Sequence, residues 1–250
     1  MNVKFKLQAD LYQFPYHYLA DLHTQRGFSR HRSWRHGFAY LCYQLHIALL
    51  IKDEKPATLL DIGCGDGRLL SLIEPVSGCQ ATGIDPCPQA IALAQAMNPE
   101  RHFICATAAE LATTFAMVTC IDVIEHLLDS EIPDFISAVA ARVEPGGLLL
   151  IGVPTINQPV PAKHYRHYHE KLLLEHLNPE AHALTVSDVS YVFNGKDMAY
   201  RLYSKITENR LVFCAVQALE NLMWHRVWNR LRCANAANGR QLLVSLRKNG

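Results

Sequence analysis

Along the middle of the chain, the pattern of apolar and polar residues alternates between short blocks that predict strands and short blocks that predict helices. Short apolar runs rich in Val, Ile and Leu predict buried strands, whereas apolar residues three and four positions apart predict amphipathic helices. The expected strands are 58–63, 80–85, 102–106, 117–124 and 147–154, and the expected helices between them are 67–76, 88–97 and 131–143. Such alternation is typical of βαβ units, so we expect a parallel sheet with helices on both faces.

The two ends of the chain have a different pattern. Residues 38–51 predict a helix before the sheet, and after Pro161 we expect a helix at 169–177, a strand at 184–193, a long helix at 209–233 and a last strand at 240–248. The fold class predicted is therefore α/β: a doubly wound, mostly parallel, seven-strand Rossmann-like sheet, with an N-terminal helical extension and a helical insertion before the last strand. The expected division is an extension or lid at 1–55 and one domain at 56–250, made of a core at 57–155, side elements at 156–238 and the final strand at 240–248.

Composition excludes several classes of protein. Half of the 250 residues are hydrophobic and the formal net charge is +1, so we expect a packed core and no stable nucleic-acid partner. The eight cysteines include no CxxC pair, which favours reduced thiols in a cytoplasmic protein over a disulfide framework or a zinc site. No segment has the pattern of a signal peptide or of a membrane span.

The stretch LLDIGCGDG, residues 59–67, places three glycines between the first expected strand and the first expected helix. Gly63, Gly65 and Gly67 would let the backbone turn sharply and approach a ligand closely. Asp85 ends the second expected strand, about 20 residues farther on, where an acid accepts hydrogen bonds from the ribose of a bound nucleoside. Together these features predict a nucleoside-containing cofactor.

Two such cofactors fit this geometry, a dinucleotide and an adenosyl group. The spacing GxGxG differs from the GxGxxG of dinucleotide sites, and Asp61 would repel a diphosphate. The same carboxylate would attract the ammonium and sulfonium groups of S-adenosylmethionine. The balance favours a cationic cofactor without phosphate, and a dinucleotide oxidoreductase is the least favoured class.

Four segments, LLDIGCGDG, GIDP, DVIEHL and VEPGGLLLIGVP, in this order and spacing, resemble the class I S-adenosylmethionine-dependent methyltransferases over residues 57–155. The resemblance implies that Gly63 and Gly65 lie behind the methionine part of the cofactor, that Asp85 holds the ribose and that Asp122 lies beside the transferred methyl. The full cofactor set that it implies is Asp61, Gly63, Cys64, Gly65, Asp85, Pro86, Thr107 and Asp122.

Two positions depart from the family pattern. Thr107 stands where many members have an Asp that contacts the adenine amine, and Ala116 replaces an acid at the start of the fourth expected strand. A threonine oxygen can still accept that hydrogen bond, though more weakly. Neither departure removes the resemblance.

The segment DVIEHL brings Asp122, Glu125 and His126 to the end of a strand. Carboxylates and imidazoles could together hold a divalent metal that activates a hydroxyl. Ubiquinone-biosynthesis O-methyltransferases and small-RNA 2′-O-methyltransferases are similar here, since they carry ExxEH and use it for a metal; in this chain the first Glu is Asp122. Further ligands could come from His164, His167 and His169. Because VIEHL is common in class I members without a metal, we favour a site with no metal.

The same residues suit proton transfer without a metal. A methyl acceptor must lose a proton as it attacks, and histidine titrates near neutral pH. We expect the catalytic residues to be His126, His167 and Asp122, with His164 behind them. In the basic segment 163–170, His164, Arg166 and Tyr168 are expected to contact the acceptor, and a solvated surface loop is the equally weighted alternative.

Two weaker resemblances concern the acceptor. The segments VPTINQPVPAKHYRHY and FPYHYL are similar to stretches of methyltransferases of bacterial cell-surface glycans and glycolipids. Tyr16 and His17, in the second of them, could stack on a sugar or lipid, or simply pack over the sheet. The Trp and Arg residues of 209–233 favour a buried helix, with a membrane-surface helix as the alternative, so peripheral membrane contact stays open.

The function that these features predict is an S-adenosylmethionine-dependent methyltransferase that modifies a hydroxyl of a small-molecule, glycan or glycolipid-type acceptor. One alternative is a metal-assisted RNA 2′-O-methyltransferase, which the low net charge disfavours. Another is a non-catalytic member that only binds the cofactor. The acceptor atom and the oligomeric state stay open.

Overall fold

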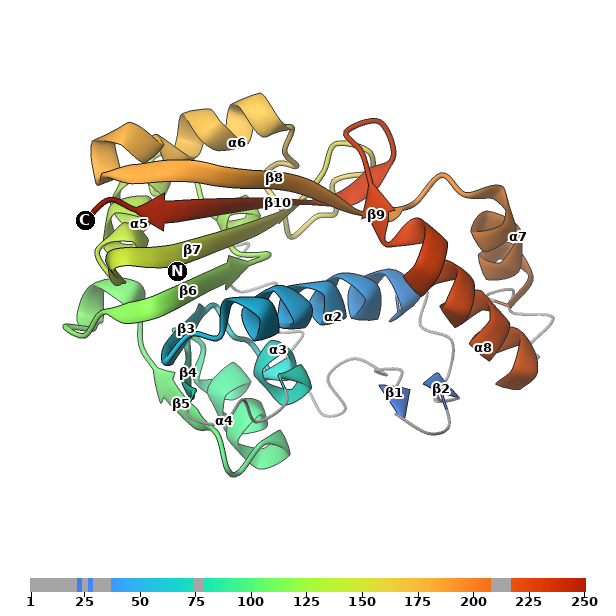
Figure 1. The fold of residues 1–250 in the computed structure, drawn as a ribbon, viewed down its shortest axis with the longest axis horizontal. Coiled ribbons are helices and arrows are strands. Elements are labelled where there is room, and N and C mark those ends of the chain that lie inside the picture. Colours follow the sequence, from blue (N-terminus) through green and yellow to red (C-terminus); the bar gives the residue numbers. More distant parts are fainter. Residues whose placement is uncertain (1–21, 24–26, 29–36, 74–78, 208–216) are drawn as a thin grey trace.

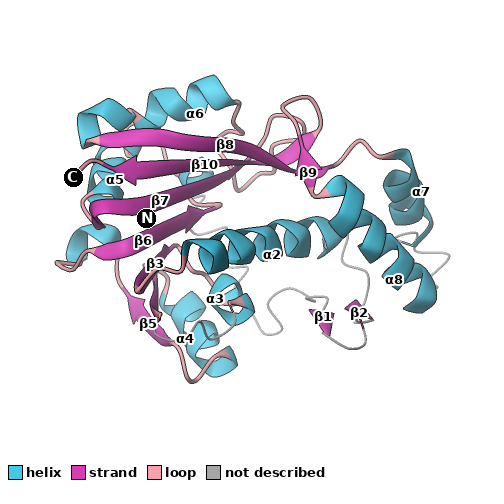
Figure 2. Cartoon of the chain, viewed as in Figure 1, coloured by secondary structure: helices cyan, strands magenta, loops and turns pink. Residues whose placement is uncertain are grey.

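One eight-stranded sheet forms the centre of the computed structural model, which describes residues 22–23, 27–28, 37–73, 79–207 and 217–250 (Figures 1 and 2). The strand order is β5-β4-β3-β6-β7-β10-β8-β9. The strands are β3 (Thr58–Ile62), β4 (Gln80–Asp85), β5 (His102–Cys105), β6 (Phe115–Ile121), β7 (Val143–Pro154), β8 (Leu184–Asn194), β9 (Cys233–Ala234) and β10 (Gly239–Lys248). A separate short ladder pairs β1 (Leu22–His23) with β2 (Gly27–Phe28).

The order and direction of the strands indicate which edge of the sheet could bind a ligand. The five strands from β3 to β7 are parallel, whereas β10 runs antiparallel to both β7 and β8. The chain passes from β3 outward to β4 and β5, then returns to β6 on the other side of β3. In open α/β sheets, ligands bind outside the carboxyl ends of the strands at such a reversal. The ends of β3 and β6 are therefore where a site is expected.

Helices cover both faces of the sheet because successive strand residues point to opposite sides. One face carries a core that includes Leu59 and Met117 and is covered by α2 (Gly37–Glu54), α3 (Arg68–Leu72) and α4 (Pro88–Met97). The other face carries Leu60 and Val118 and is covered by α5 (Ile132–Ala140) and α6 (Glu170–Leu177). The helices α7 (Met198–Thr207) and α8 (Gln217–Arg226) lie together at one end of the molecule (Figure 1).

Short helical turns complete the described structure. They are the 3-10 turns η1 (Ala108–Glu110), η2 (Ile124–His126) and η3 (Pro179–His182), and the π-helical segment η4 (Val227–Leu231) that continues α8. Of these, η2 matters most for the site because it directly follows the carboxyl end of β6.

The predicted α/β class, the Rossmann-like sheet and the helical insertion before the last strand are confirmed, with two differences of detail. The sheet has eight strands and not seven, because Cys233 and Ala234 pair with β8 as a short edge strand where a helix end was expected. Helix α7 was not predicted, since only Tyr200 and Tyr203 turn toward the core and the rest of it is polar or exposed. Part of the predicted helix 209–233 lies outside the described residues.

The tryptophans of this region pack inward. Trp224 is buried and stacks on Phe38, with ring centroids 6.3 Å apart, and on Trp228, at 5.8 Å. Arg232 lies over the Trp228 ring at 4.4 Å. The Trp–Arg cluster therefore joins α8 and η4 to the core, as the favoured prediction for this stretch had it. In the described part of the chain, no helix is long and apolar enough to cross a membrane.

Candidate functional site

A cavity of about 740 Å³ opens at the predicted edge of the sheet. Its walls come from the turn after β3, the end of β6, the loop after β7, the start of β10, and one side each of α2 and α7. A cavity of this size falls within the range of small-molecule and cofactor sites. The predicted residues that line it are Asp61, Gly63, Cys64, Gly65, Asp122, Glu125, His126, His164 and His167.

The turn after β3 needs glycine for two physical reasons. Gly63, Gly65 and Gly67 all have left-handed backbone conformations, with φ of 73°, 56° and 76°. A Cβ added to Gly63 would lie 2.4 Å from Cγ2 of Val123, which is far too close for carbon atoms. The backbone N–H groups of Gly63 and Cys64 donate to the carbonyl of Ile84 at 2.8 and 2.9 Å, which fixes the turn against β4. The turn thus presents bare backbone to the cavity.

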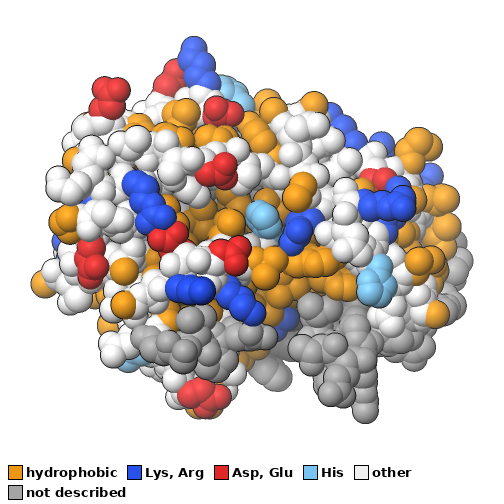
Figure 3. Space-filling model, viewed as in Figure 1, with side chains coloured by type: hydrophobic (Ala, Val, Ile, Leu, Met, Phe, Trp, Pro, Cys, Tyr) orange, Lys and Arg blue, Asp and Glu red, His pale blue; other side chains and the backbone are white. Residues whose placement is uncertain are grey.

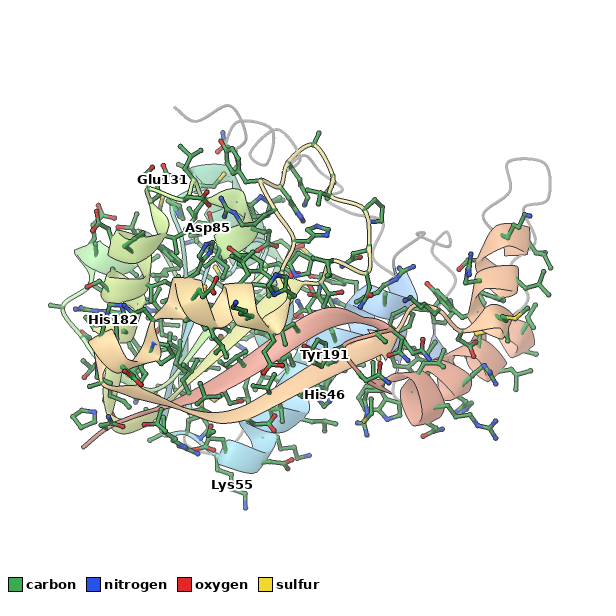
Figure 4. All side chains as sticks on the ribbon, turned by 90° about the horizontal axis from the view of Figure 1, so that it is seen from above. His46, Lys55, Asp85, Glu131, His182 and Tyr191 are labelled. Atoms are coloured by element: carbon green, nitrogen blue, oxygen red, sulfur yellow. The ribbon has the colours of Figure 1, made fainter. Side chains whose placement is uncertain are left out.

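Two buried carboxyl groups flank this turn. Asp61 accepts a hydrogen bond of 2.7 Å from the hydroxyl of Thr119, and burial raises its pKa from 3.8 to about 7. Asp85, labelled in Figure 4, accepts from the backbone N–H of Gly65 at 3.2 Å and of Cys87 at 2.8 Å, and burial raises its pKa as well. A cationic ligand beside Asp61 would favour the ionised carboxylate. The site therefore fits the charge of S-adenosylmethionine.

Three predicted cofactor residues, Asp85, Pro86 and Thr107, lie outside the lining of the cavity. Pro86 directly follows Asp85, and its carbonyl oxygen lies 3.8 Å from the thiol sulfur of Cys105. Thr107 caps η1: its backbone N–H and its hydroxyl both donate to the Glu110 carboxylate, at 2.7 and 2.8 Å. The hydroxyl oxygen keeps acceptor capacity. A contact of Thr107 with adenine stays a prediction.

Asp122 is held by residues far away in the sequence. It directly follows β6 and has a positive φ of 55°. Its two carboxylate oxygens accept from the hydroxyl of Tyr43 and from Nε2 of Gln241, the latter at 3.2 Å. Burial raises the pKa of Asp122, whereas these hydrogen bonds and nearby Lys163 lower it. Sequence patterns gave no signal for Tyr43 or Gln241, since each lies on an element distant from β6.

Glu125 is the most unusual group of the cavity. Its side chain is fully buried, and neither carboxyl oxygen has a hydrogen-bond partner among the described residues. Burial, followed by the neighbouring Asp122 charge, raises its pKa well above the ordinary value. A buried polar group without a partner is energetically unfavourable, so it indicates that a ligand or ion completes the site.

Three histidines of the same cavity, His126, His164 and His167, have a defined hydrogen-bond pattern. Nδ1 of His126 lies 3.0 Å from the carbonyl of Lys163, and Nδ1 of His167 lies 3.1 Å from the carbonyl of Gln158. Because a carbonyl only accepts, both Nδ1 atoms donate. Nε2 of His167 must then accept from Nδ1 of His164, at 2.9 Å. In their neutral forms, His126 and His164 consequently carry their lone pairs on Nε2.

These lone pairs converge with Glu125. One ligand-type atom from each of Glu125, His126 and His164 lies within 4.8 Å of the others. Nε2 of His126 is 4.0 Å from Oε1 of Glu125, and the rings of His126 and His164 are 4.6 Å apart at their centroids. The structure thus groups Glu125 and His126 with His164, whereas the predicted metal set had Asp122 in that place.

Two residues of the 163–170 segment support the loop from behind the cavity. Arg166 pairs with Asp129 at 2.6 Å and donates to the carbonyl of Ile124 at 3.3 Å. Tyr168 is fully buried, its hydroxyl is 3.2 Å from Nδ1 of His176, and burial raises its pKa to about 12. The solvated-loop alternative is therefore wrong for Tyr168. Tyr16 and His17 lie outside the described residues.

Lys163 brings a positive charge to the acidic floor. It lines the cavity, and burial lowers its pKa although Asp122 and Glu125 act in the opposite direction. Farther out, Arg201 and Lys205 of α7 and Arg240 of β10 also line the cavity. The cavity is therefore lined by carboxyl groups, with lysine and arginine side chains around them.

Known proteins are similar to this chain in sequence and fold. A family model described as a methyltransferase domain matches residues 33–226. The ubiquinone biosynthesis O-methyltransferase of Methylobacterium nodulans is 37% identical over 100 residues, which are 36% of this chain and 38% of that protein. The enzyme of the same name from Rhizobium leguminosarum bv. trifolii is 40% identical over 113 residues, 42% of each chain. The similarity thus spans less than half the length of these relatives.

A solved structure shows the same fold. The magnesium protoporphyrin IX methyltransferase of Synechocystis PCC 6803, with bound S-adenosylmethionine, superposes with a TM-score of 0.56 at 13% sequence identity. The superposition covers 99% of this chain and 92% of that one. At this identity the similarity establishes the arrangement of the sheet and helices.

Proposed function

Because the chain belongs to the methyltransferase-domain family, we propose that it is an S-adenosylmethionine-dependent methyltransferase that modifies a hydroxyl of a small-molecule, glycan or glycolipid-type acceptor. The observation that carries the proposal is the convergence of Glu125, His126 and His164 in the same cavity as the glycine turn. A hydroxyl must lose a proton during transfer, and this cluster offers imidazole nitrogens to accept it.

The side of the cavity formed by the glycine turn has the backbone and carboxyl groups that S-adenosylmethionine requires. The turn at Gly63 and Gly65 lets the ligand approach the backbone, and buried Asp61 offers a negative charge to an ammonium or sulfonium. Asp85, at the end of β4, would accept from the ribose hydroxyls. When bound, S-adenosylmethionine supplies an electrophilic methyl group.

On the acceptor side, His126 is the proposed general base. The hydrogen bond from its Nδ1 to the carbonyl of Lys163 fixes the ring and places the lone pair of the neutral imidazole on Nε2, the atom that would take the acceptor proton. His164 is the second candidate, and the geometry favours it over His167, since His164 and not His167 lies in the cluster with Glu125 and His126. His167 then acts as a positioning residue that orients His164.

The nature of the acceptor is inferred from relatives and from residue types. The similar proteins named above carry O-methyltransferase names, which supports oxygen as the methylated atom. Aromatic residues near the N-terminus, including Tyr16 and His17, support a sugar- or lipid-bearing acceptor. The lid role of residues 1–55 belongs to the same proposal, and Tyr40, Tyr43 and Gln44 of α2 line the cavity from that part of the chain.

The test uses methyl-labelled S-adenosylmethionine and an extract of the source cells, separated into lipid, polar-metabolite, RNA and protein pools. The proposal predicts label in the lipid or polar pool, released only under conditions that cleave methyl ethers or esters. Label in RNA or protein would contradict the acceptor class. Binding of S-adenosylhomocysteine without label in any pool would favour the non-catalytic alternative.

Metal-assisted transfer is the second candidate, and buried Glu125 favours it specifically. Two unpartnered carboxyl oxygens beside two imidazole nitrogens form a donor set that divalent first-row metals accept. The hydrogen bonds that orient His126 and His164 resemble the outer-shell contacts of metal-bound histidines. Glu125, His126 and His164 would hold the ion, which would help a hydroxyl lose its proton.

A metal titration separates the two candidates. If a metal binds there, Mn²⁺ should raise the unfolding temperature of the wild type and leave Glu125→Gln unchanged, and a chelator should abolish transfer. If neither addition nor chelation has an effect, the metal-free base remains. Lys171→Gln, an exposed change on α6, is the control for nonspecific effects of the ion.

A further inference from the structure

The end of the molecule that carries α7 and α8 exposes large apolar side chains (Figure 3). On α7, Met198, Leu202 and Ile206 are 82%, 60% and 52% exposed. Residues four apart lie on one face of a helix, so the three form a continuous stripe. Leu219 and Leu222 of α8 are exposed as well. We call Met198, Leu202 and Ile206 the apolar stripe.

The opposite face of α7 is firmly packed. Tyr200 and Tyr203 are buried and meet the ring of Phe38 edge-on, at centroid distances of 6.3 and 5.5 Å. At the start of α7, Asp197 accepts two hydrogen bonds from Arg226 of α8, at 3.0 and 2.6 Å. The helix is therefore fixed to the core, and the stripe is presented outward.

A cationic edge separates the apolar stripe from the cavity. At about 100° per residue, Arg201 and Lys205 lie between Ser204, which faces the cavity, and Met198, which begins the stripe. Both cations line the cavity wall. In the part of the chain that the structure describes, neither of them forms an ion pair with a carboxylate. Around α7, the order is thus core, cavity, cations and apolar stripe.

This order is what an interfacial helix requires. A strongly amphipathic helix that lies in a bilayer surface buries an apolar stripe at the acyl boundary, while adjacent Lys and Arg meet anionic headgroups. A second copy of the chain would also cover apolar residues. Arg201 and Lys205 beside the stripe, which pair with no carboxylate of the described residues, favour an anionic occupant over an identical cationic edge.

We propose that α7 docks on the surface of an anionic lipid bilayer, with the apolar stripe inserted and with Arg201 and Lys205 facing lipid phosphates. Because these two cations also line the cavity, docking brings the cavity mouth to the headgroup region. An amphiphilic acceptor could then enter from the membrane without leaving it. This link to the acceptor rests on the proposed function, whereas the docking does not.

Vesicle sedimentation tests the docking with the full chain. The wild type should sediment with vesicles of phosphatidylcholine mixed with phosphatidylglycerol, bind less to phosphatidylcholine alone, and lose binding as salt increases. The double variant Leu202→Ser/Ile206→Ser should bind about tenfold or more weakly. The reason is that each aliphatic side chain that enters the bilayer removes apolar surface from water and so contributes to the free energy of binding. Lys205→Glu should reduce binding only to the anionic vesicles.

Matched controls make the result decisive. Val186→Ser removes an exposed apolar side chain from β8 and should leave vesicle binding unchanged. Unfolding temperature and S-adenosylhomocysteine affinity should be equal in the wild type, in Leu202→Ser/Ile206→Ser and in Val186→Ser, which shows that the cofactor site is intact. Wild type that stays in solution with anionic vesicles, or a double variant that binds as well as wild type, overturns the proposal. So does dimerisation that the double variant abolishes without vesicles.

Discussion

The two walls of the cavity are built in different ways. The cofactor wall comes from consecutive residues of the turn 61–67 after β3. Asp85 ends the neighbouring parallel strand β4 and supports this turn by accepting a hydrogen bond from the N–H of Gly65. The acceptor wall is assembled from α2, η2, the loop after β7, α7 and β10, which meet only in the fold. The first wall is a local motif, and the second is a product of tertiary structure.

Because they are built differently, the two walls are suited to different tasks. Backbone turns and buried carboxyl groups are suited to hold one invariant cofactor, and they are fixed by short-range hydrogen bonds. Histidines on a loop, oriented by carbonyl groups, can be exchanged without disturbing that turn. Substitutions in the two walls should therefore have separable effects on cofactor binding and on transfer.

The largest effect is expected on the acceptor wall. His126→Ala should lower the rate of labelled methyl transfer by about 10²–10⁴-fold, because general-base assistance is lost. Its affinity for S-adenosylhomocysteine should stay within about twofold of wild type. His182→Ala is the matched control: His182 lies in η3, beside Lys248 at the end of β10, and does not line the cavity. An unchanged rate in His126→Ala would exclude it as the base.

The next effect concerns the stability of the cofactor wall. Since the folded protein raises the pKa of Asp61 from 3.8 to about 7, it holds a proton that the unfolded chain releases. Stability should therefore fall as pH rises from about 4 to about 7, and stay lower above that range. Asp61→Asn removes this penalty and should be more stable at pH 8 by up to about 4 kcal/mol, at about 1.4 kcal/mol per pKa unit.

Denaturant unfolding at pH 5 and pH 8 measures this effect. A weaker decline should persist in Asp61→Asn, because burial also raises the pKa of Asp66, to about 6, and of Asp85. Cofactor affinity should fall in the same variant, since the charge that attracts the cation is gone. Equal pH dependence in variant and wild type would contradict the raised pKa of Asp61.

A smaller effect is expected from crowding the turn. Gly63→Ala should weaken S-adenosylhomocysteine binding by about 10- to 100-fold, because the new Cβ would displace Val123 and the left-handed backbone costs about 1–2 kcal/mol. Gly146→Ala is a matched control: it has a similar φ of 75°, but no atom lies within 4 Å of the added Cβ. If Gly63→Ala and Gly146→Ala weaken S-adenosylhomocysteine binding by the same factor, the strain of the left-handed backbone explains the loss, and the contact of the new Cβ with Val123 does not.

The smallest effect is expected where the two walls meet. Tyr43→Phe removes the hydroxyl that donates to Asp122, so transfer should slow by about two- to tenfold, the equivalent of one hydrogen bond. Cofactor affinity should change little. Tyr191→Phe removes a hydroxyl that contacts Glu170 on the surface and serves as the control. A loss of cofactor affinity equal to the loss of rate would place Tyr43 in the cofactor wall.

The same difference explains what could be predicted from the sequence. The sheet, the glycine turn and Asp85 follow from local patterns, because each motif spans about as many residues as one βα unit. Tyr43 and Gln241 could not be found, since they are 79 and 119 positions away from Asp122. The pairing of His164 with His167 depends on loop geometry, which periodicity does not encode. Helix α7 was missed because its apolar residues face outward.

If cofactor binding and acceptor chemistry belong to separate walls of the cavity, substitutions in the two walls should affect cofactor affinity differently. The most direct test is calorimetric affinity for S-adenosylhomocysteine in Asp85→Ala and Glu125→Gln, measured side by side with the wild type. The account predicts a loss of about tenfold or more for Asp85→Ala, because hydrogen bonds to a charged group disappear, and nearly unchanged affinity for Glu125→Gln. Equal affinities in the two variants, whether both weakened or both unchanged, would contradict it.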